Sequence, residues 1–216
     1  MIQEIIDTIV KPRLADLSTI GILGGLVNTV TREDPREGQG PVRLSYPVGC
    51  GVSGTDCWAN GRYLALTPDN SKASVAFAEV TSHSIQNTDS SRRFVALWRV
   101  RWYFWANLAH MGQTGCGIPF PLLEQWRNAL SFEASGTPYD GVLARGNVLA
   151  ALTTADPSSV WGKWTFGQQQ GLFMYPYAWC AIDVEISANY APECIPAFEA
   201  SSKIVCVTVG EPYPLT

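Results

Sequence analysis

Residues 91–111 read SRRFVALWRVRWYFWANLAHM, and this aromatic stretch decides the fold. Successive side chains of a strand point to opposite faces of a sheet, so its middle separates into two sets. One set is wholly apolar and comprises Phe94, Ala96, Trp98, Val100, Trp102 and Phe104. The other carries two arginines followed by aromatics and comprises Val95, Leu97, Arg99, Arg101, Tyr103 and Trp105. The pattern predicts a long strand at the centre of a sheet, and none of these residues is typical of a catalyst.

The composition is that of a folded protein with an unusually uncharged, aromatic character. The chain has 216 residues, of which 46% are hydrophobic and 16% charged, and it contains eight tryptophans. Soluble domains carry roughly 25% charged residues. Aromatic residues concentrate at the cores of protein interfaces, so the composition indicates either a surface partly hidden in an assembly or a large monomer core. The length predicts a single domain over residues 1–216.

Charge and the N-terminal residues exclude two classes of partner. A net charge of −4 and a pI near 5.2 argue against general nucleic-acid binding. The first residues, MIQEIIDTIVKPRL, place acids inside the apolar run and Pro12 behind it, which fits neither a signal peptide nor a membrane span. We therefore expect a protein that is made and kept in a cytoplasm, with no membrane partner.

Six cysteines raise the question of disulfides or a metal. They form no C-x-x-C pair, and the chain has only two histidines to complete a zinc site. Free and mostly buried thiols are expected, and whether Cys50 and Cys57 form a bridge stays open. The six are Cys50, Cys57, Cys116, Cys180, Cys194 and Cys206.

The rest of the chain reads as a mixture of helices and strands. An amphipathic helix begins at Ile2, and Pro12 is expected to kink or end it. Asp156 followed by Pro157 predicts the capped start of a short helix over residues 158–163. A second helix is predicted over residues 119–130, strands over residues 42–46, 62–66, 73–80, 142–152, 172–190 and 204–209, a turn at 67–70, and exposed loops over residues 31–41 and 82–91.

Two of these strands carry opposite charges at the same spacing. Arg99 and Arg101 lie two apart on one strand, and Asp183 and Glu185 lie two apart on the other. If the strands are antiparallel neighbours, the charges pair across them, which is worth roughly 0.2–1 kcal/mol per exposed pair. The alternative is two unrelated polar faces.

A search for catalytic chemistry finds no motif. The segment Gly51-Val52-Ser53-Gly54 lacks the G-x-S-x-G spacing of a nucleophile elbow, and no glycine run continues into Gly-Lys-Ser/Thr. His83 and His110 are predicted to be surface or interface residues. Asp183 and Glu185 are the best available carboxylate pair for glycoside hydrolysis, but both are predicted on an exposed face. We expect no catalytic residue, no cofactor and no metal.

The order of elements carries a resemblance. An amphipathic helix precedes strands, the aromatic strand ends in Trp105-Ala106-Asn107, a helix follows, and the closing strand runs into Tyr190-Ala-Pro-Glu-Cys-Ile-Pro. This layout resembles the tail-terminator and neck-ring proteins of tailed bacteriophages, including crAss-like phages. The resemblance implies an α+β fold, assembly into a ring at the head–tail junction, and no catalytic residues.

The expectations are therefore as follows. The fold is α+β, an antiparallel sheet with an N-terminal amphipathic helix and one or two further short helices packed on it. The protein is a non-enzymatic ring subunit of a phage neck or tail, located in the virion and made in the host cytoplasm. Its partners are copies of itself in a hexamer or dodecamer, the portal, adaptor or tail-tube proteins, and DNA that passes the lumen without specific binding. The proposed subunit or cross-strand contacts are Arg99, Arg101, Tyr103, Trp105, Asp183 and Glu185.

Two alternatives from other classes remain. One is an aromatic-faced carbohydrate- or receptor-binding module of a tail fibre, which exposed tryptophans would serve. The other is a small hydrolase in which a cysteine or serine works with His83 or His110.

Overall fold

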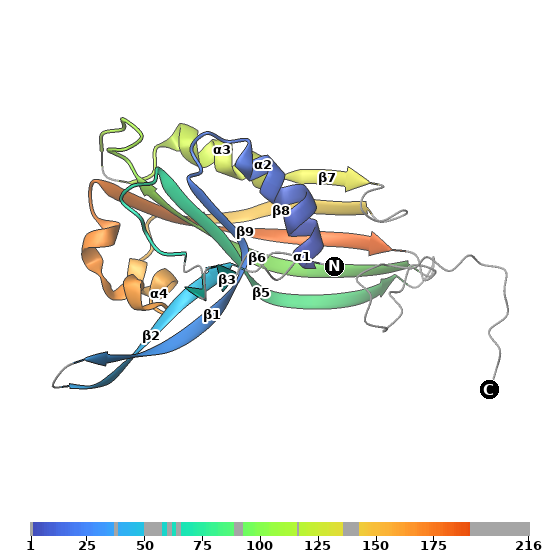
Figure 1. Cartoon of the computed structure of the whole chain (residues 1–216). Coiled ribbons are helices and arrows are strands. Elements are labelled where there is room, and N and C mark those ends of the chain that lie inside the picture. Colours follow the sequence, from blue (N-terminus) through green and yellow to red (C-terminus); the bar gives the residue numbers. More distant parts are fainter. Residues whose placement is uncertain are drawn as a thin grey trace.

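The computed structural model describes residues 2–36, 39–49, 58–59, 62–63, 66–88, 93–115, 117–135 and 143–190. Within these residues the chain forms an α+β fold around one seven-stranded sheet, as predicted (Figure 1). The strand order is β2-β1-β5-β6-β9-β8-β7, which places β6 at the centre. Its strands are β1 (Ile22–Arg36), β2 (Gln39–Gly49), β5 (Ser74–Thr88), β6 (Arg93–Asn107), β7 (Phe132–Ser135), β8 (Leu143–Leu152) and β9 (Tyr177–Tyr190).

The sheet is mixed, whereas the sequence predicted an antiparallel one. The pairing of β1 with β5 is parallel, and the other pairings are antiparallel. Strand β2 returns antiparallel along β1 to its starting end, so the chain then enters β5 in the same direction as β1. Two short strands, β3 (Trp58–Ala59) and β4 (Arg62–Tyr63), form a separate hairpin. Of the strand predicted over residues 62–66, only Arg62 and Tyr63 form a strand in the described residues.

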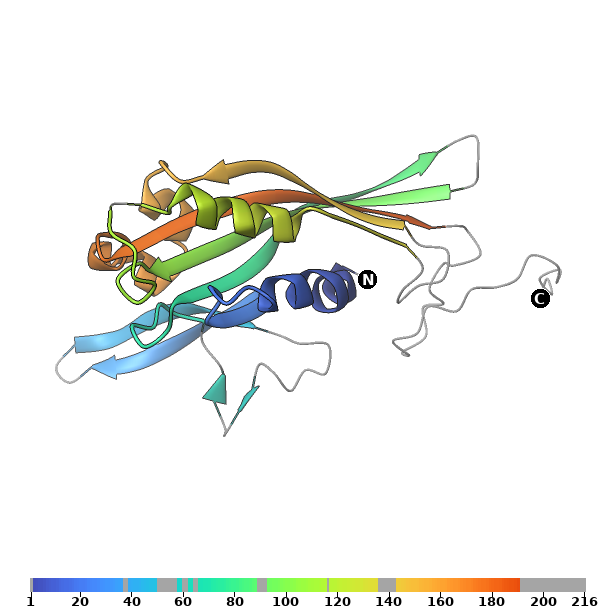
Figure 2. The ribbon, with the colours of Figure 1, turned by 90° about the horizontal axis from the view of Figure 1, so that it is seen from above.

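Helices cover one face of the sheet. The N-terminal helix runs through α1 (Ile2–Ile5), the π-helical turn η1 (Ile6–Val10) and α2 (Lys11–Ala15). In the π turn the Lys11 amide bonds to the Ile6 carbonyl, a five-residue spacing that lets the helix pass Pro12 without ending. Helix α3 (Phe120–Leu130) lies beside α2, and Figure 2 shows both from above.

The first core lies between these helices and the sheet. The predicted apolar face of β6 is buried here, with Trp102 and Phe104 fully inaccessible. Phe104 stacks on Trp126 of α3, with ring centroids 4.4 Å apart. From β9 the core takes alternate residues, namely Cys180, Ile182, Val184, Ile186 and Ala188.

A second core covers the opposite face of β5, β6 and β9. It is built by α4 (Pro157–Trp161) and the 3₁₀ turns η2 (Thr165–Gln168) and η3 (Gln170–Phe173). Asp156 caps α4 by accepting from the Ser158 amide, and Pro157 occupies the first turn, as predicted. The apolar residues of this core are Leu66, Val75, Phe77, Tyr103, Trp105, Val160, Trp161, Trp164, Phe166, Trp179 and Ala181.

Both predicted polar loops are strands instead. Residues 31–36 continue β1, and residues 39–41 open β2, so the two strands form a long hairpin. Residues 82–88 continue β5 along β6, past a register shift between Val80 and Ser82. The polar composition was misleading because cross-strand hydrogen bonds satisfy the backbone whatever the exposed side chains are. Pro35 lies where the β1–β2 register shifts, a position that tolerates the missing amide.

The remaining predictions are met in part. Helix α3 and strand β8 agree with the predicted segments, and α4 ends two residues early. Strand β9 begins at Tyr177 rather than at residue 172, because residues 170–173 form η3. The predicted strand over 204–209, and Cys50, Cys57, Cys116, Cys194 and Cys206, lie outside the described residues. None of the helices in the described part is long and apolar enough to cross a membrane.

Candidate functional site

A row of charged side chains crosses three strands on the second face of the sheet. The register places Arg101 of β6 between Glu79 of β5 and Asp183 of β9. Arg101 donates from Nε to Oδ1 of Asp183 at 2.6 Å and from Nη2 to Oδ2 at 2.9 Å. This two-point geometry is the strongest form of an arginine–carboxylate contact. The expected cross-strand contact is thus present between Arg101 and Asp183.

Lys163 completes the row from the layer above. Its ammonium forms an ion pair with Glu79 and lies 4.5 Å from the ring centroid of Trp164. The hydroxyl of Tyr103 also donates to Glu79, at 3.0 Å. Two acids and two bases therefore neutralise one another beside an aromatic cluster, and their side chains are 15–43% exposed.

The pKa values reflect this arrangement. The hydrogen bond that Arg101 donates to Asp183 is the main cause that raises the pKa of Arg101, so this guanidinium stays charged. Burial, followed by the negative charge of Glu79, raises the pKa of Tyr103 well above its usual value, so this phenol stays protonated. Within the row, Arg101 is therefore charged and Tyr103 neutral near neutral pH.

The other predicted charge pair is different. Arg99 and Glu185 lie opposite each other in the β6–β9 register. Arg99 is exposed, and in the part of the chain that the structure describes no ion pair joins the two side chains. Only one of the two expected contacts is formed.

Tyr103 and Trp105 do not face outward, contrary to the sequence-based interpretation that assembly alone would bury them. Their exposed fractions are 4% and 1%, because residues 157–173 fold over them. The Trp105 indole donates to the Leu172 carbonyl at 2.6 Å. Tyr103 meets the ring of Trp164 at 4.9 Å. These two residues are core residues of the subunit and are not available to a neighbour.

Sequence reasoning missed Glu79, Lys163 and the aromatic cover of the site. The signal available was the density of aromatics in residues 161–173, where Trp161, Trp164, Phe166 and Phe173 follow closely. Seven tryptophans have described side chains, and none of these is more than 8% exposed.

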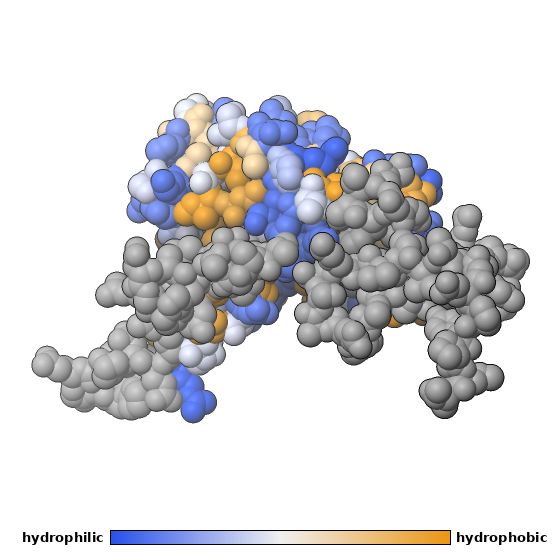
Figure 3. All heavy atoms as spheres, turned by 45° about the vertical axis from the view of Figure 1, so that its right-hand side comes forward, coloured by the Kyte–Doolittle hydropathy of each residue, from blue (hydrophilic) through white to orange (hydrophobic). Residues whose placement is uncertain are grey.

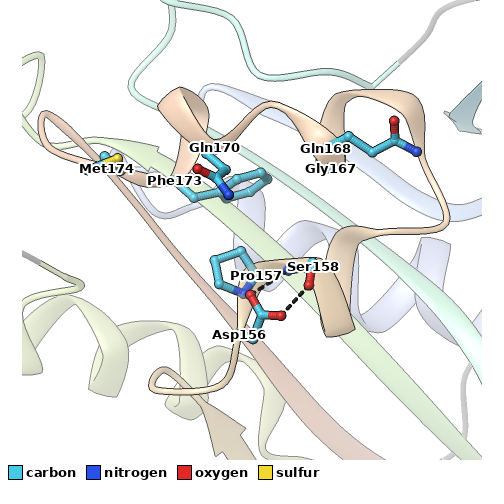
Figure 4. Close-up of a pocket in the computed structure, with 8 residues that line it drawn as sticks. All are labelled: Asp156, Pro157, Ser158, Gly167, Gln168, Gln170, Phe173 and Met174. Atoms are coloured by element: carbon cyan, nitrogen blue, oxygen red, sulfur yellow. Dashed lines mark hydrogen bonds between the residues drawn. The ribbon is translucent and has the colours of Figure 1, made fainter.

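Two hollows lie on either side of this cover. One has a volume of about 360 Å³ and is lined by residues of the 156–174 segment, including Asp156, Ser158, Gln170 and Phe173 (Figure 4). The other has a volume of about 600 Å³ and is lined in part by Tyr46, Asp69, Phe166 and Leu172.

The carboxylates of both hollows are engaged in local turns. Hydrogen bonds from Ser158 lower the pKa of Asp156, and hydrogen bonds from Ser71 lower the pKa of Asp69. Each is therefore a poor candidate for a general acid.

The described cysteine and the two histidines differ in exposure. Cys180 lies in the first core, and burial raises the pKa of its thiol, which keeps it protonated and unreactive. His83 and His110 are exposed. The described residues contain no cluster of three His, Cys, Asp or Glu side chains that could hold a metal ion.

Strands β1 and β2 extend beyond the two cores and are a candidate site for contact with another chain. Strand β1 pairs with β5 only as far as Leu26 opposite Ala78, and from there it continues with β2 as a two-stranded arm (Figure 1). Figure 3 shows apolar side chains gathered in a compact patch on one side of the molecule. The large apolar residues that are most exposed are Val80, Ile85, Phe120, Leu149, Met174 and Tyr175.

Comparison of the chain with protein-family models, with curated proteins and with solved structures gives no match in any of the three.

Proposed function

We propose that the protein is a structural subunit of a phage virion that forms a ring in the neck or tail, as a tail terminator or a head–tail connector. The ring is a homo-oligomer, a hexamer or a dodecamer, that joins the portal region to the tail. The subunit acts without catalysis, cofactor or metal, and DNA passes through the lumen without specific binding.

The observation that carries this proposal is the β1–β2 arm. Beyond Leu26, the two strands of the arm have no strand partner but each other among the described residues, and they pair as far as Arg36 opposite Gln39. Near its base the Ser45 amide donates to the Thr165 hydroxyl at 2.7 Å, which fixes the arm to the second core. A two-stranded hairpin alone is marginally stable in water. An arm of this length is therefore expected to rest on a neighbouring subunit.

Closed rings suit such an arm. In a head-to-tail ring each subunit presents one surface to the next copy and a different surface to the previous one. The arm supplies the first surface, and the exposed apolar residues Phe120 and Leu149 are candidates for the second. The low charge of the chain fits a surface that is partly covered on assembly.

The carbohydrate-binding alternative has weaker support. It relied on exposed tryptophans as stacking platforms, and the seven whose side chains are described are buried. The hydrolase alternative relied on a cysteine or serine near a histidine, and the described cysteine, Cys180, is buried in the first core.

Native mass spectrometry and negative-stain microscopy of the purified full-length chain test the proposal. We expect rings of a single closed order, and we expect the protein in purified virions. A protein that stays monomeric at all concentrations and is missing from virions would refute the proposal.

A shortened arm tests the role of the hairpin. Replacing residues 33–43 by Asn-Gly closes the hairpin after Arg32 opposite Leu44 with a two-residue turn. We expect folded monomers, with the near-ultraviolet circular dichroism of the tryptophan cores unchanged. A matched variant with a Gly/Ser linker of the original length in place of residues 33–43 controls for chain length. Rings formed by both variants would show that the arm is not the subunit contact.

A further inference from the structure

The outer edge of β5 is open over much of its length. Strand β1 pairs with β5 at three positions, the last of which is Leu26 opposite Ala78. From Glu79 to Thr88 the other edge of β5 pairs with β6, whereas the described residues provide no strand partner for the outer edge. An edge of this kind presents unpaired amides and carbonyls that can pair with an added strand.

This edge carries few of the usual protections against pairing beyond the register shift between Val80 and Ser82. Natural edge strands are guarded by lysines, prolines or inward charges, but the sequence EVTSHSIQNT of residues 79–88 contains no Lys, Arg or Pro. Two apolar side chains lie along it on the first face, since Val80 is opposite Val100 and Ile85 is opposite Ala96. They are 39% and 61% exposed, so an added strand with an apolar row would cover them.

We propose that residues 204–209 of the same chain, IVCVTV, add to this edge as an eighth strand antiparallel to β5. These residues comprise three valines, one isoleucine and one threonine, all of them β-branched, together with Cys206, and they contain no charge and no proline. Both faces of the segment, Ile204/Cys206/Thr208 and Val205/Val207/Val209, offer an apolar row for Val80 and Ile85. The segment therefore fits the edge in either register.

The position of Tyr190 supports this occupant. Strand β9 ends at Tyr190, which is opposite Phe94 of β6, and Phe94 is opposite Asn87 of β5. Two strand spacings separate Tyr190 from Asn87, about 10 Å. The thirteen residues 191–203 lie between Tyr190 and the segment and can span up to about 45 Å. The tether is therefore more than long enough.

The direction of the chain also fits. Strand β9 ends, at Tyr190, at the same end of the sheet where β5 finishes, at Thr88. A segment that enters from this end runs against β5, which gives antiparallel pairing. Because the tether is short, the effective concentration of the segment at its own edge exceeds that of another copy at ordinary protein concentrations.

Hydrogen–deuterium exchange on the full-length chain tests the inference. We expect slow exchange of the amides in residues 79–88 and about tenfold faster exchange in Val207→Pro, since proline removes a ladder amide and disfavours the strand. Ala200→Pro, which places the same residue in the tether, is the matched control and should keep the slow exchange. If the amides of residues 79–88 exchanged at the same rate in the natural chain and in Val207→Pro, whether that rate is fast or slow, the inference would be overturned.

Dilution separates this arrangement from exchange of the segment between copies. Protection of residues 79–88 that does not change with protein concentration supports pairing within one chain. Protection that disappears on dilution, or a dimer of Val207→Pro in which the edge stays protected, would overturn it. This readout is independent of ring formation, so the two proposals fail separately.

Discussion

Arg101 of β6 lies opposite Asp183 of β9, and its guanidinium donates one hydrogen bond to each oxygen of the Asp183 carboxylate. Both side chains are less than one-third exposed, so water screens the pair less than it screens a surface pair. We expect Arg101→Ala and Asp183→Ala each to lower the free energy of unfolding. In a double-mutant cycle measured by urea unfolding, the coupling energy should be about 1 kcal/mol or more.

Arg99 and Glu185 provide the control for this cycle. They occupy the neighbouring register position of the same two strands but form no ion pair in the described structure. Their coupling should be about 0.3 kcal/mol or less. Similar coupling energies for the two pairs would mean that strand position, rather than the observed contact, decides the interaction.

Gly167 holds the cover of the second core close to the sheet. A Cβ at this position would overlap the backbone carbonyl of Trp161, which cannot move without disturbing α4. We therefore expect Gly167→Ala to lower the free energy of unfolding by about 1–3 kcal/mol and to reduce the near-ultraviolet signal of the buried tryptophans. Gly171→Ala is the control, because a Cβ there meets no atom within 4 Å, and it should change stability by about 0.5 kcal/mol or less.

Arg13 links the N-terminal helix to the end of α3. Its guanidinium donates to three carbonyls at that helix end, those of Ala129, Asn128 and Ser131, at 2.9, 3.3 and 3.0 Å. Cations at a helix C-terminus are favourable, and the planar fork matches several acceptors at once. We expect Arg13→Ala to cost about 1–2 kcal/mol of unfolding free energy and Arg13→Lys to recover only part of it.

Arg145→Ala is the comparison for Arg13. This arginine also forms an ion pair, with Glu133, but both side chains are about half exposed or more. Its loss should change the unfolding free energy by about 0.5 kcal/mol or less. If Arg145→Ala lowered the unfolding free energy as much as Arg13→Ala, the contacts of Arg13 at the end of α3 would contribute no more than an exposed ion pair.

Much of the fold could be predicted from β6. Its apolar face alternates strictly, and two-residue periodicity has one structural meaning, so the strand, its central place and its buried face followed from residues 94–104. The same logic identified the core face of β9. Charges at the same spacing can pair if their strands are antiparallel neighbours, so the Arg101–Asp183 contact was one of two arrangements open from the sequence.

The rest depended on contacts that periodicity does not encode. Tyr103 and Trp105 shared a face with arginines, so nothing in β6 alone predicted that residues 157–173 would bury them. Glu79 lies in the charge row because β5 is the neighbour of β6, and Lys163 lies there because α4 and the residues after it pack on the sheet. Both positions depend on tertiary structure, which the sequence pattern does not encode. The arm was missed because residues 31–41 are polar and rich in glycine and proline, a composition typical of loops.

The ionisation of Tyr103 makes the stability of the fold depend on pH in the alkaline range. Its folded pKa is raised above the ordinary value of about 10, mainly by burial and then by Glu79. Above pH 10 the unfolded chain therefore loses this proton while the folded chain keeps it. The stability that the protonated phenol contributes is fully present below pH 10 and declines as the pH rises beyond it.

The comparison of the natural chain with Tyr103→Phe isolates this effect from other groups that titrate in alkali. Phenylalanine keeps the ring contacts with Phe77 and Trp164 but removes both the hydrogen bond to Glu79 and the ionisable group. In urea unfolding at a series of pH values, we expect the natural chain to lose stability relative to Tyr103→Phe as the pH rises above 10. A difference that stays constant across this range would contradict a buried, protonated Tyr103, since the linkage between ionisation and unfolding requires the two curves to approach or cross.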